Sequence, residues 1–188
     1  RTPKFDMDKL HAILSREAAY EKNPPLAGQS TAAKLTWKVA IGSIHDPQEA
    51  KPWRYTTENP GAGWEATGFN AASWTEAPAP FGKKEGSWND RIKTKWATHD
   101  LWLRQTFTYD GAPFDAAAIV MHHDDEVKIY VNGKEIRQQQ GWNDRYEAFD
   151  VTEALRGALA AGENTLAVQV HQDKGGQYFD MALLTGSR

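Results

Sequence analysis

The sequence lacks cysteine, long apolar runs and an excess of positive charge. Because none of its 188 residues is cysteine, disulfide bonds and thiol catalysis are excluded, although this absence does not separate a cytoplasmic from a periplasmic protein. No apolar stretch approaches the roughly 20 residues of a membrane-spanning helix. A net charge of −3 gives no support to a nucleic acid or an anionic membrane as partner, since both need a basic surface.

Catalytic motifs are also missing. There is no G-x-S-x-G nucleophile turn and no phosphate-binding glycine loop, since Gly175-Gly176 has only the pattern of a tight turn. Carboxylates are abundant, and glycoside hydrolysis uses two of them about 5 to 10 Å apart. However, Asp150 is expected to serve in a turn or cap, and Asp180 in a structural hydrogen bond. We therefore expect the chain alone to be non-catalytic, with a small carboxylate-dependent glycan hydrolase or lyase as an alternative.

Alternation of apolar and polar residues is the dominant pattern of the chain. Val127, Ile129 and Val131 are separated by polar or amphipathic residues, which is the period of a half-buried strand. Asn132-Gly133 follows, and both residues tolerate the positive φ that a type I′ turn needs. The stretch from 127 to 138 is therefore predicted to be a β-hairpin.

Eight such segments, separated by turn residues, predict an antiparallel β-sandwich of the jelly-roll type and an all-β fold class. Thr152 is expected to cap a short helical turn at 153–160 that ends at Gly162. The predicted strands lie at 53–57, 101–109, 117–122, 127–131, 135–138, 146–150, 165–171 and 178–184.

The first 33 residues have a different pattern and divide the chain into an N-terminal helix with connector, 1–33, and a sandwich domain, 34–188. Phe5, Leu10 and Leu14 recur at helical spacing, and Asn23-Pro24-Pro25 ends that helix. Residues 35–41 alternate again and are expected to add an edge strand. The chain starts at Arg1 without methionine, so we expect a fragment of a longer protein.

Four segments resemble a known family. The succession "VKIYVNGKEI", "GW" and "YEAFDVTEALRGALAAGENTLAVQV" is similar to the jelly-roll sugar-binding domain of glycoside hydrolase family 2 enzymes. More broadly, it resembles the galactose-binding-like fold of many carbohydrate-binding modules. "GWEATGFNAASWTEAPAPFG" resembles the opening of such domains, "DLWLRQTFTYD" their first long strand, and "HQDKGGQYFDMALL" the closing strand of modules in bacterial polysaccharide-degrading enzymes. The resemblance covers about residues 53–184 and implies this fold, in which many domains are purely structural.

Three loops carry the side chains that saccharide binding needs, namely an aromatic platform beside planar polar groups. They span 83–96, 141–146 and 172–178, and the four-residue sequence W-N-D-R occurs in the first two. If both copies lie at one end of the sandwich, they form a groove with a tryptophan on each wall. The predicted ligand-binding residues are Trp88, Arg91, His123, Trp142, Asn143, Arg145, Tyr146 and Gln177.

Structural roles compete with these assignments. Trp142 is equally compatible with capping the core, and Arg145 with pairing to Asp144 or Glu147. The run at 122–126, HHDDE, has side chains that bind transition metals. On an extended chain, however, successive side chains face opposite ways, so this run does not close around an ion. No cofactor is required, and the resemblance implies a structural calcium ion without assigning its ligands.

Together these observations predict a non-catalytic carbohydrate-binding or accessory module of a larger, exported bacterial glycoside hydrolase. The expected partner is a glycan or the catalytic domain of the parent protein. The expected location is periplasmic, cell-surface or secreted. A purely structural interdomain sandwich without a ligand is the main alternative.

Overall fold

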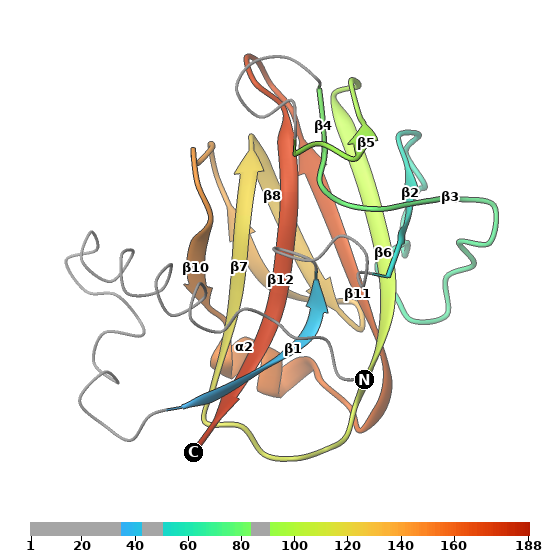
Figure 1. The fold of residues 1–188 in the computed structure, drawn as a ribbon. Helices are drawn as coiled ribbons and strands as arrows, with labels where there is room; N and C mark the ends of the chain where they lie inside the picture. Colours follow the sequence, from blue (N-terminus) through green and yellow to red (C-terminus); the bar gives the residue numbers. More distant parts are fainter. Residues whose placement is uncertain (1–34, 43–50, 84–90) are drawn as a thin grey trace.

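The computed structural model describes residues 35–42, 51–83 and 91–188, which form two β-sheets packed face to face (Figure 1). The prediction of an all-β sandwich is confirmed. The finer assignment to a galactose-binding-like jelly roll stays a prediction. The helix expected within residues 1–33, and therefore the proposed division of the chain, lies outside the described residues, as do positions 84–90.

The first sheet, called sheet A, contains the last strand of the chain at its centre. β12 pairs with β7 over most of its length and with β4 at its start. The strands of sheet A are β10 (Glu147–Asp150), β7 (Ala116–Asp124), β12 (Tyr178–Ser187), β4 (Phe81–Gly82) and β5 (Thr94–Lys95), with β1 (Thr36–Gly42) pairing beside β12.

The second sheet, called sheet B, is antiparallel throughout its described pairings. Its central strands, β6 and β11, pair over ten residues from Asp100–His171 to Tyr109–Gly162. The strands of sheet B, in spatial order, are β3 (Thr75–Ala77), β2 (Trp53–Thr56), β6 (Asp100–Tyr109), β11 (Gly162–His171), β8 (Glu126–Val131) and β9 (Lys134–Gln139).

The extra strand expected at 35–41 is confirmed as β1. It runs antiparallel to β12, with Trp37 opposite Gly186. The absence of a side chain at Gly186 lets the Trp37 ring approach, because a Cβ there would meet ring atoms at 3.1 Å. Trp37 thereby packs on the outer face of sheet A beside Ala182 and Leu184.

The hairpin predicted around Asn132-Gly133 is confirmed between β8 and β9. Asn132 has φ 52° and Gly133 has φ 80°, the left-handed conformations of a type I′ turn. Val131 pairs with Lys134 directly across the turn. The turn therefore sets the pairing next to it, whereas the register shifts between Ile129 and Tyr130, and the aliphatic residues of β8 face the core.

The helical turn is confirmed, but the predicted cap is wrong. α2 runs from Thr152 to Ala158, its N-cap position is Val151, and no side chain caps it there. The Thr152 hydroxyl instead lies 2.5 Å from Asp150 Oδ1, and the same oxygen accepts the Thr152 amide at 2.8 Å. Asp150 therefore satisfies the first amide of the helix, which agrees with the turn or capping role expected for it.

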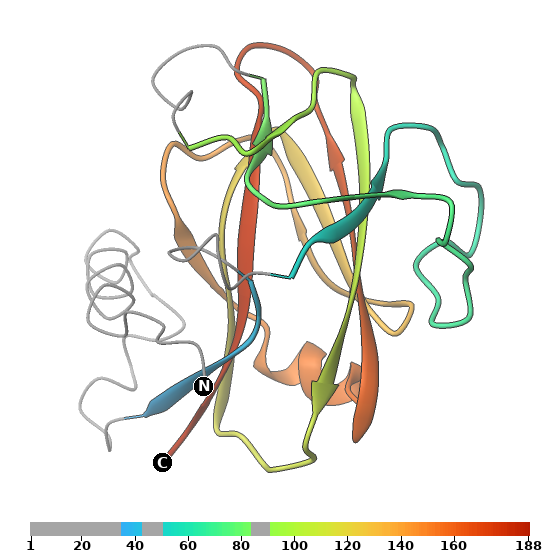
Figure 2. The same cartoon turned by 45° about the vertical axis from the view of Figure 1, so that its right-hand side comes forward.

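The main core fills the space between the sheets, and each sheet also buries part of its outer face. Leu101, Leu103 and Ile129 belong to the inner cluster. Trp64 and Trp102 pack on the outer face of sheet B. α2 closes one end of the sandwich, whereas the loops after β9 and β11 lie at the opposite end (Figures 1 and 2). The described parts of the three candidate loops therefore share one end of the molecule.

Candidate functional site

The loop between β9 and β10 is anchored by Asn143. The backbone amide of Asn143 donates to the His123 carbonyl at 3.0 Å, and Oδ1 of the Asn143 side chain accepts the backbone amide of His123 at 2.8 Å. Its Nδ2 also donates to the Met121 carbonyl at 3.3 Å. The buried Asn143 side chain makes hydrogen bonds to the backbone of β7 that a neighbouring strand would otherwise make. These bonds fix the loop backbone on both sides of Asn143. Asn143 is therefore placed to position the loop rather than to face solvent.

Trp142, next to this anchor, points into solvent. It is 66% exposed and is the large hydrophobic residue that stands out as exposed within the described part of the chain. The alternative that Trp142 caps the core is therefore wrong. An exposed indole offers a flat apolar face with a hydrogen-bonding edge, which is what stacking on a sugar ring uses.

Arg145, on the same loop, is exposed and lies between two carboxylates. Its Nε is 3.9 Å from Asp144 Oδ1 and 3.8 Å from Glu147 Oε1. Both pairings considered from the sequence are therefore present. Ion pairs of this length between exposed side chains are weak, about 0 to 1 kcal/mol.

Tyr146 belongs to a buried group on the outer face of sheet A, here called the tyrosine–aspartate cluster: Tyr146, Tyr178, Asp180 and His122. The Tyr146 hydroxyl donates to Asp180 Oδ2 at 2.7 Å and lies 3.1 Å from the Tyr178 hydroxyl. Asp180 is directly opposite His122 in the pairing of β12 with β7. The His122 ring packs 4.3 Å from the Tyr178 ring and 5.7 Å from the Tyr146 ring.

Burial controls the protonation of this cluster. It raises the pKa of Asp180 to about 7, although the hydrogen bond from Tyr146 acts in the opposite direction. Burial, and next the neighbouring His123, lower the pKa of His122 to about 4. Burial also raises the pKa of Tyr178 to about 12. Near neutral pH the cluster therefore holds a neutral imidazole and a carboxyl that exchanges its proton.

Asp180 of this cluster is closed to direct contact with a ligand, whereas Tyr146 is partly exposed. Asp180 is 1% exposed, and its Oδ1 has no hydrogen-bond partner within the described ranges. A polysaccharide therefore cannot reach this carboxyl as it would the acid of a glycosidase. The carboxyl instead supports Tyr146, which links the exposed loop to sheet A.

Arg91 lies near the same cluster although it is distant in sequence. Burial dominates the pKa shifts of His122 and Tyr178, and the charge of Arg91 adds a smaller lowering effect on both pKa values. Asp144 also acts on His122. The structure thus brings the described residue of the first W-N-D-R sequence toward the second. Trp88, on the first, lies outside the described residues.

His123 and Gln177 are placed differently from the other predicted residues. His123 is 1% exposed, and its Nδ1 is 2.6 Å from the Asp125 carbonyl. The Gln177 side chain is buried and donates to the Thr98 carbonyl at 2.7 Å. Both side chains therefore make structural hydrogen bonds, and their part in ligand binding stays a prediction.

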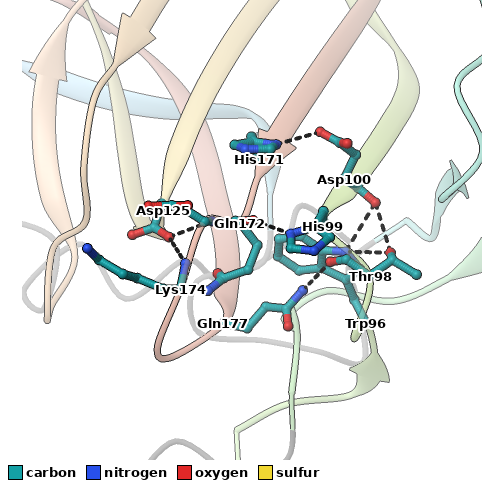
Figure 3. A network of polar contacts seen from close by, with 10 residues as sticks. Trp96, Thr98, His99, Asp100, Asp125, His171, Gln172, Lys174 and Gln177 are labelled. Atoms are coloured by element: carbon teal, nitrogen blue, oxygen red, sulfur yellow. Dashed lines mark hydrogen bonds and ion pairs between the residues drawn. The ribbon is translucent and has the colours of Figure 1, made fainter.

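The third candidate loop, at 172–178, is held by polar contacts at the end of the sandwich (Figure 3). Asp125 Oδ2 accepts the amides of Asp173 and Lys174 at 2.8 and 3.2 Å. The Gln172 amide donates to the His99 carbonyl at 2.6 Å, and His99 Nδ1 is 2.9 Å from the Gln172 carbonyl. The backbone of this loop is therefore held by Asp125, which lies between β7 and β8, and by the segment before β6.

The pair Asp124 and Asp125 belongs to the run 122–126 that was considered for metal binding, and neither residue was predicted as a ligand-binding residue. Burial, and then the hydrogen bond with Asp125, raise the pKa of half-buried Asp124 to about 7. Such a pKa suits a general acid. Asp125, however, is buried against the loop amides of Asp173 and Lys174. The pair is therefore arranged to hold a loop, and its adjacency in sequence was the signal that marked it.

The described ranges also bear on the presence of a metal site and of a membrane-spanning helix. No group of three or more His, Asp or Glu side chains there gathers as metal ligands. His122 and His123 face opposite sides of β7, as strand alternation requires. The calcium expectation stays a prediction. None of the described helices is long and apolar enough to cross a membrane.

Comparison with known proteins finds likeness in fold only. No family model matches the sequence, and no curated protein does. A solved glycosyl hydrolase family 2 member from Bacteroides cellulosilyticus superposes with TM-score 0.52 and 15% identity, over 72% of this chain and 20% of that chain. A Bacteroides uniformis beta-glucuronidase gives TM-score 0.55 and 17% identity, over 81% and 18%. A Lactobacillus rhamnosus beta-glucuronidase gives TM-score 0.52 and 20% identity, over 81% and 29%. This chain therefore spans less than a third of the length of each of these proteins.

Proposed function

We propose that this chain is a non-catalytic accessory domain of a larger bacterial glycoside hydrolase. The observation that carries the proposal is the coverage of the fold likeness: 72–81% of this chain matches 18–29% of three bacterial glycosidases. A domain that recurs as a minor part of large glycosidases is expected to support or extend their catalytic domain. The bacterial origin of these enzymes also supports the predicted exported setting, since polysaccharides are met outside the cell.

The finer part of the proposal is that the loop 141–146 binds carbohydrate. Trp142 supplies a platform for the C–H face of a sugar, and Arg145 supplies planar donors for neighbouring hydroxyls. Asn143 and Tyr146 hold the loop from beneath, which reduces the entropy lost on binding. The charge of Arg91 also acts on His122 of the cluster. A small stacking site of this kind is expected to bind in the range of about 1 μM to 1 mM.

A glycan array with the 188-residue chain tests this proposal. Binding to one class of glycan is expected, and Trp142→Ala is expected to weaken it at least tenfold without changing the melting temperature. Gln140→Ala is the matched control, because Gln140 is an exposed residue of the same connection. Repeating the array with calcium and with a chelator tests the structural calcium ion, whose removal would lower the melting temperature.

Silence across a broad array, or equal binding by Trp142→Ala, would exclude the loop as a sugar site. The second candidate function, a structural domain that packs against a neighbouring domain, would then be favoured. The same exposed Trp142 supports that candidate, since an exposed indole is also a frequent interface anchor. Turnover of a polysaccharide by the chain alone, abolished by one carboxylate substitution, would instead revive the hydrolase or lyase alternative.

A further inference from the structure

A groove of about 440 Å³ crosses the outer face of sheet B. This volume falls within the range of about 300–1,000 Å³ typical of small-molecule sites. The groove is on the sheet opposite the tyrosine–aspartate cluster, and none of the predicted ligand-binding residues lines it. The charged residues of its lining are Lys51, Arg54, Glu76, Arg104 and Glu163.

Two arginines lie side by side in this groove. Strand pairing sets Arg54 of β2 directly opposite Arg104 of β6, and Glu76 of β3 opposite Arg54. Like charges at directly opposed positions destabilise a sheet. Glu76 compensates one of them, because its Oε1 is 2.6 Å from Arg54 Nη2.

Arg104 has no ion pair of this kind with any residue that the structure describes. It is 6% exposed and donates to two neutral carbonyls, those of Trp64 and of Ala66, the second at 3.0 Å. Among the described residues, no carboxylate lies within ion-pair distance of it. Burial lowers the pKa of Arg104, which expresses the cost of holding this charge away from water, and the more distant charge of Glu65 offsets that lowering only in part. Two carbonyls use only part of its five N–H donors.

The rest of the lining suits a hydroxylated ring. Thr106 of β6 faces Thr165 of β11 across the sheet, so two hydroxyls lie next to the arginines. Phe69 contributes an aromatic wall, and the Arg104 guanidinium lies 5.4 Å from the centre of its ring. Lys51 stands exposed at the margin and adds positive charge. Hydroxyl and guanidinium groups beside an aromatic ring are the partners that sugar hydroxyls and an acidic substituent require.

We propose that this groove, named the sheet B groove, binds an acidic saccharide whose carboxylate faces Arg54 and Arg104. The carboxylate supplies Arg104 with the close ion pair that it lacks among the described residues, and the threonines meet ring hydroxyls. The inference goes beyond the proposed function, because the site lies on another face and does not depend on the loop 141–146. A neutral glycan brings no charge to the guanidinium of Arg104, which has no ion pair among the described residues, and therefore binds weakly.

Calorimetric titration of the 188-residue chain with an oligogalacturonide, and with a neutral cello-oligosaccharide of the same length, tests the proposal. The acidic oligomer is expected to bind at least tenfold more tightly, and its binding weakens as salt concentration rises. Thr106→Trp fills the groove and is expected to abolish binding. Thr108→Trp is the matched control, since Thr108 is exposed on the same strand and does not line the groove.

A second pair of variants keeps the test valid if a tryptophan disturbs folding. Lys51→Gln is expected to weaken binding of the acidic oligomer about threefold, whereas Lys95→Gln removes the same charge on sheet A and leaves affinity unchanged. Equal binding of both oligomers, no binding of the acidic one, or equal losses in the two lysine variants would overturn the proposal. The proposal would also be overturned if only Trp142→Ala abolished binding of the acidic oligomer, because the ligand would then bind at the loop 141–146.

Discussion

At the scale of single residues, Asp180 shows how burial in this sandwich changes the protonation of a carboxyl group. Its carboxyl receives a hydrogen bond from Tyr146, and Asp180 lies opposite His122 of the neighbouring strand β7 and two residues from Tyr178 on β12 itself. Burial outweighs that hydrogen bond and raises the pKa of Asp180 to about 7. The folded protein therefore holds this proton more tightly than the unfolded chain does, where the pKa is near 4.

This difference predicts a pH-dependent stability with a definite sign. The stability contributed by Asp180 is complete below its unfolded pKa and is lost as pH rises through about 7. Asp180→Asn removes the titration but keeps an acceptor for Tyr146. Between pH 5 and 8, the free energy of unfolding of the wild type should therefore fall relative to the variant by about 2 to 3 kcal/mol.

Urea denaturation of both proteins at pH 5, 6, 7 and 8 measures this change. His122 acts with the opposite sign, because burial lowers its pKa to about 4 and its stability contribution is lost as pH falls from 6.5 through 4. It is present in both proteins, so their difference isolates Asp180. A difference that stays constant with pH would show that Asp180 is not the buried titrating group.

Gly82 gives a second prediction at the residue scale, since the chain passes close to its Cα. A Cβ there would overlap the carbonyl oxygen of Gln177, which also accepts the Lys83 amide at 3.1 Å. Gly82→Ala should destabilise the protein by about 1 to 3 kcal/mol. Gly68→Ala is the matched control, because a Cβ at Gly68 would meet no atom within 4 Å. Equal melting temperatures for Gly82→Ala and Gly68→Ala would contradict this close approach.

At the scale of elements, Asn132 joins the β8–β9 hairpin to its surroundings. Its Nδ2 donates to the Ala158 carbonyl at 2.9 Å and to Asn164 Oδ1 at 2.7 Å. Its Oδ1 accepts the Thr165 amide at 2.9 Å. One side chain in the turn thus ties the hairpin to α2 and to the start of β11.

Two substitutions separate these hydrogen bonds from the turn conformation. Asn132→Gly keeps the positive φ accessible but removes the three bonds, and should cost about 2 to 3 kcal/mol of unfolding free energy. Asn132→Ala also opposes the left-handed backbone and should cost about 1 kcal/mol more. Equilibrium unfolding in urea measures both. An Asn132→Gly variant as stable as the wild type would show that the side-chain bonds contribute nothing.

Elements with many alternating residues could be predicted from the sequence, whereas short ones could not. β8 alternates buried and partly exposed positions along its whole length, and Asn132-Gly133 has few alternatives to a type I′ turn. β4 and β5 have two residues each, too few to show a period. The helix cap at Thr152 was wrong because Asp150, two residues earlier, already satisfies the first amide. Local propensity does not decide between two neighbouring acceptors.

The candidate sites divide in the same way. The composition of the loop 141–146 identified Trp142 and Arg145, because aromatic and planar polar residues are adjacent in sequence. The tyrosine–aspartate cluster needs the register between β7 and β12, which sets His122 opposite Asp180 although the two residues are far apart in the chain. The sheet B groove likewise needs the pairing of Arg54 with Arg104. Pairings between distant strands follow from the whole fold, so single-sequence patterns do not reveal them.

At the scale of the whole molecule, the order of strands predicts where the sandwich is most stable. β11 lies between β6 and β8, and β12 has β7 on one side and β4 and β1 on the other. β3, β9 and β10 each pair with a single neighbour in the described sheets. Strands with neighbours on both sides and side chains in the central core open only when both sheets separate.

Hydrogen exchange of the backbone amides should therefore be slowest in β6, β7, β11 and β12, and at least tenfold faster in β9 and β3. Opening free energies in the central strands should equal the global free energy of unfolding measured in denaturant, because their exchange requires global unfolding. Since β11 belongs to sheet B and β12 to sheet A, equal values in these two strands would mean that the sheets unfold as one cooperative unit. Slower exchange in one sheet than in the other would contradict cooperative unfolding of the two sheets. The core between them, which includes Leu103 and Ile119, would then be a weaker interface between two separately stable sheets.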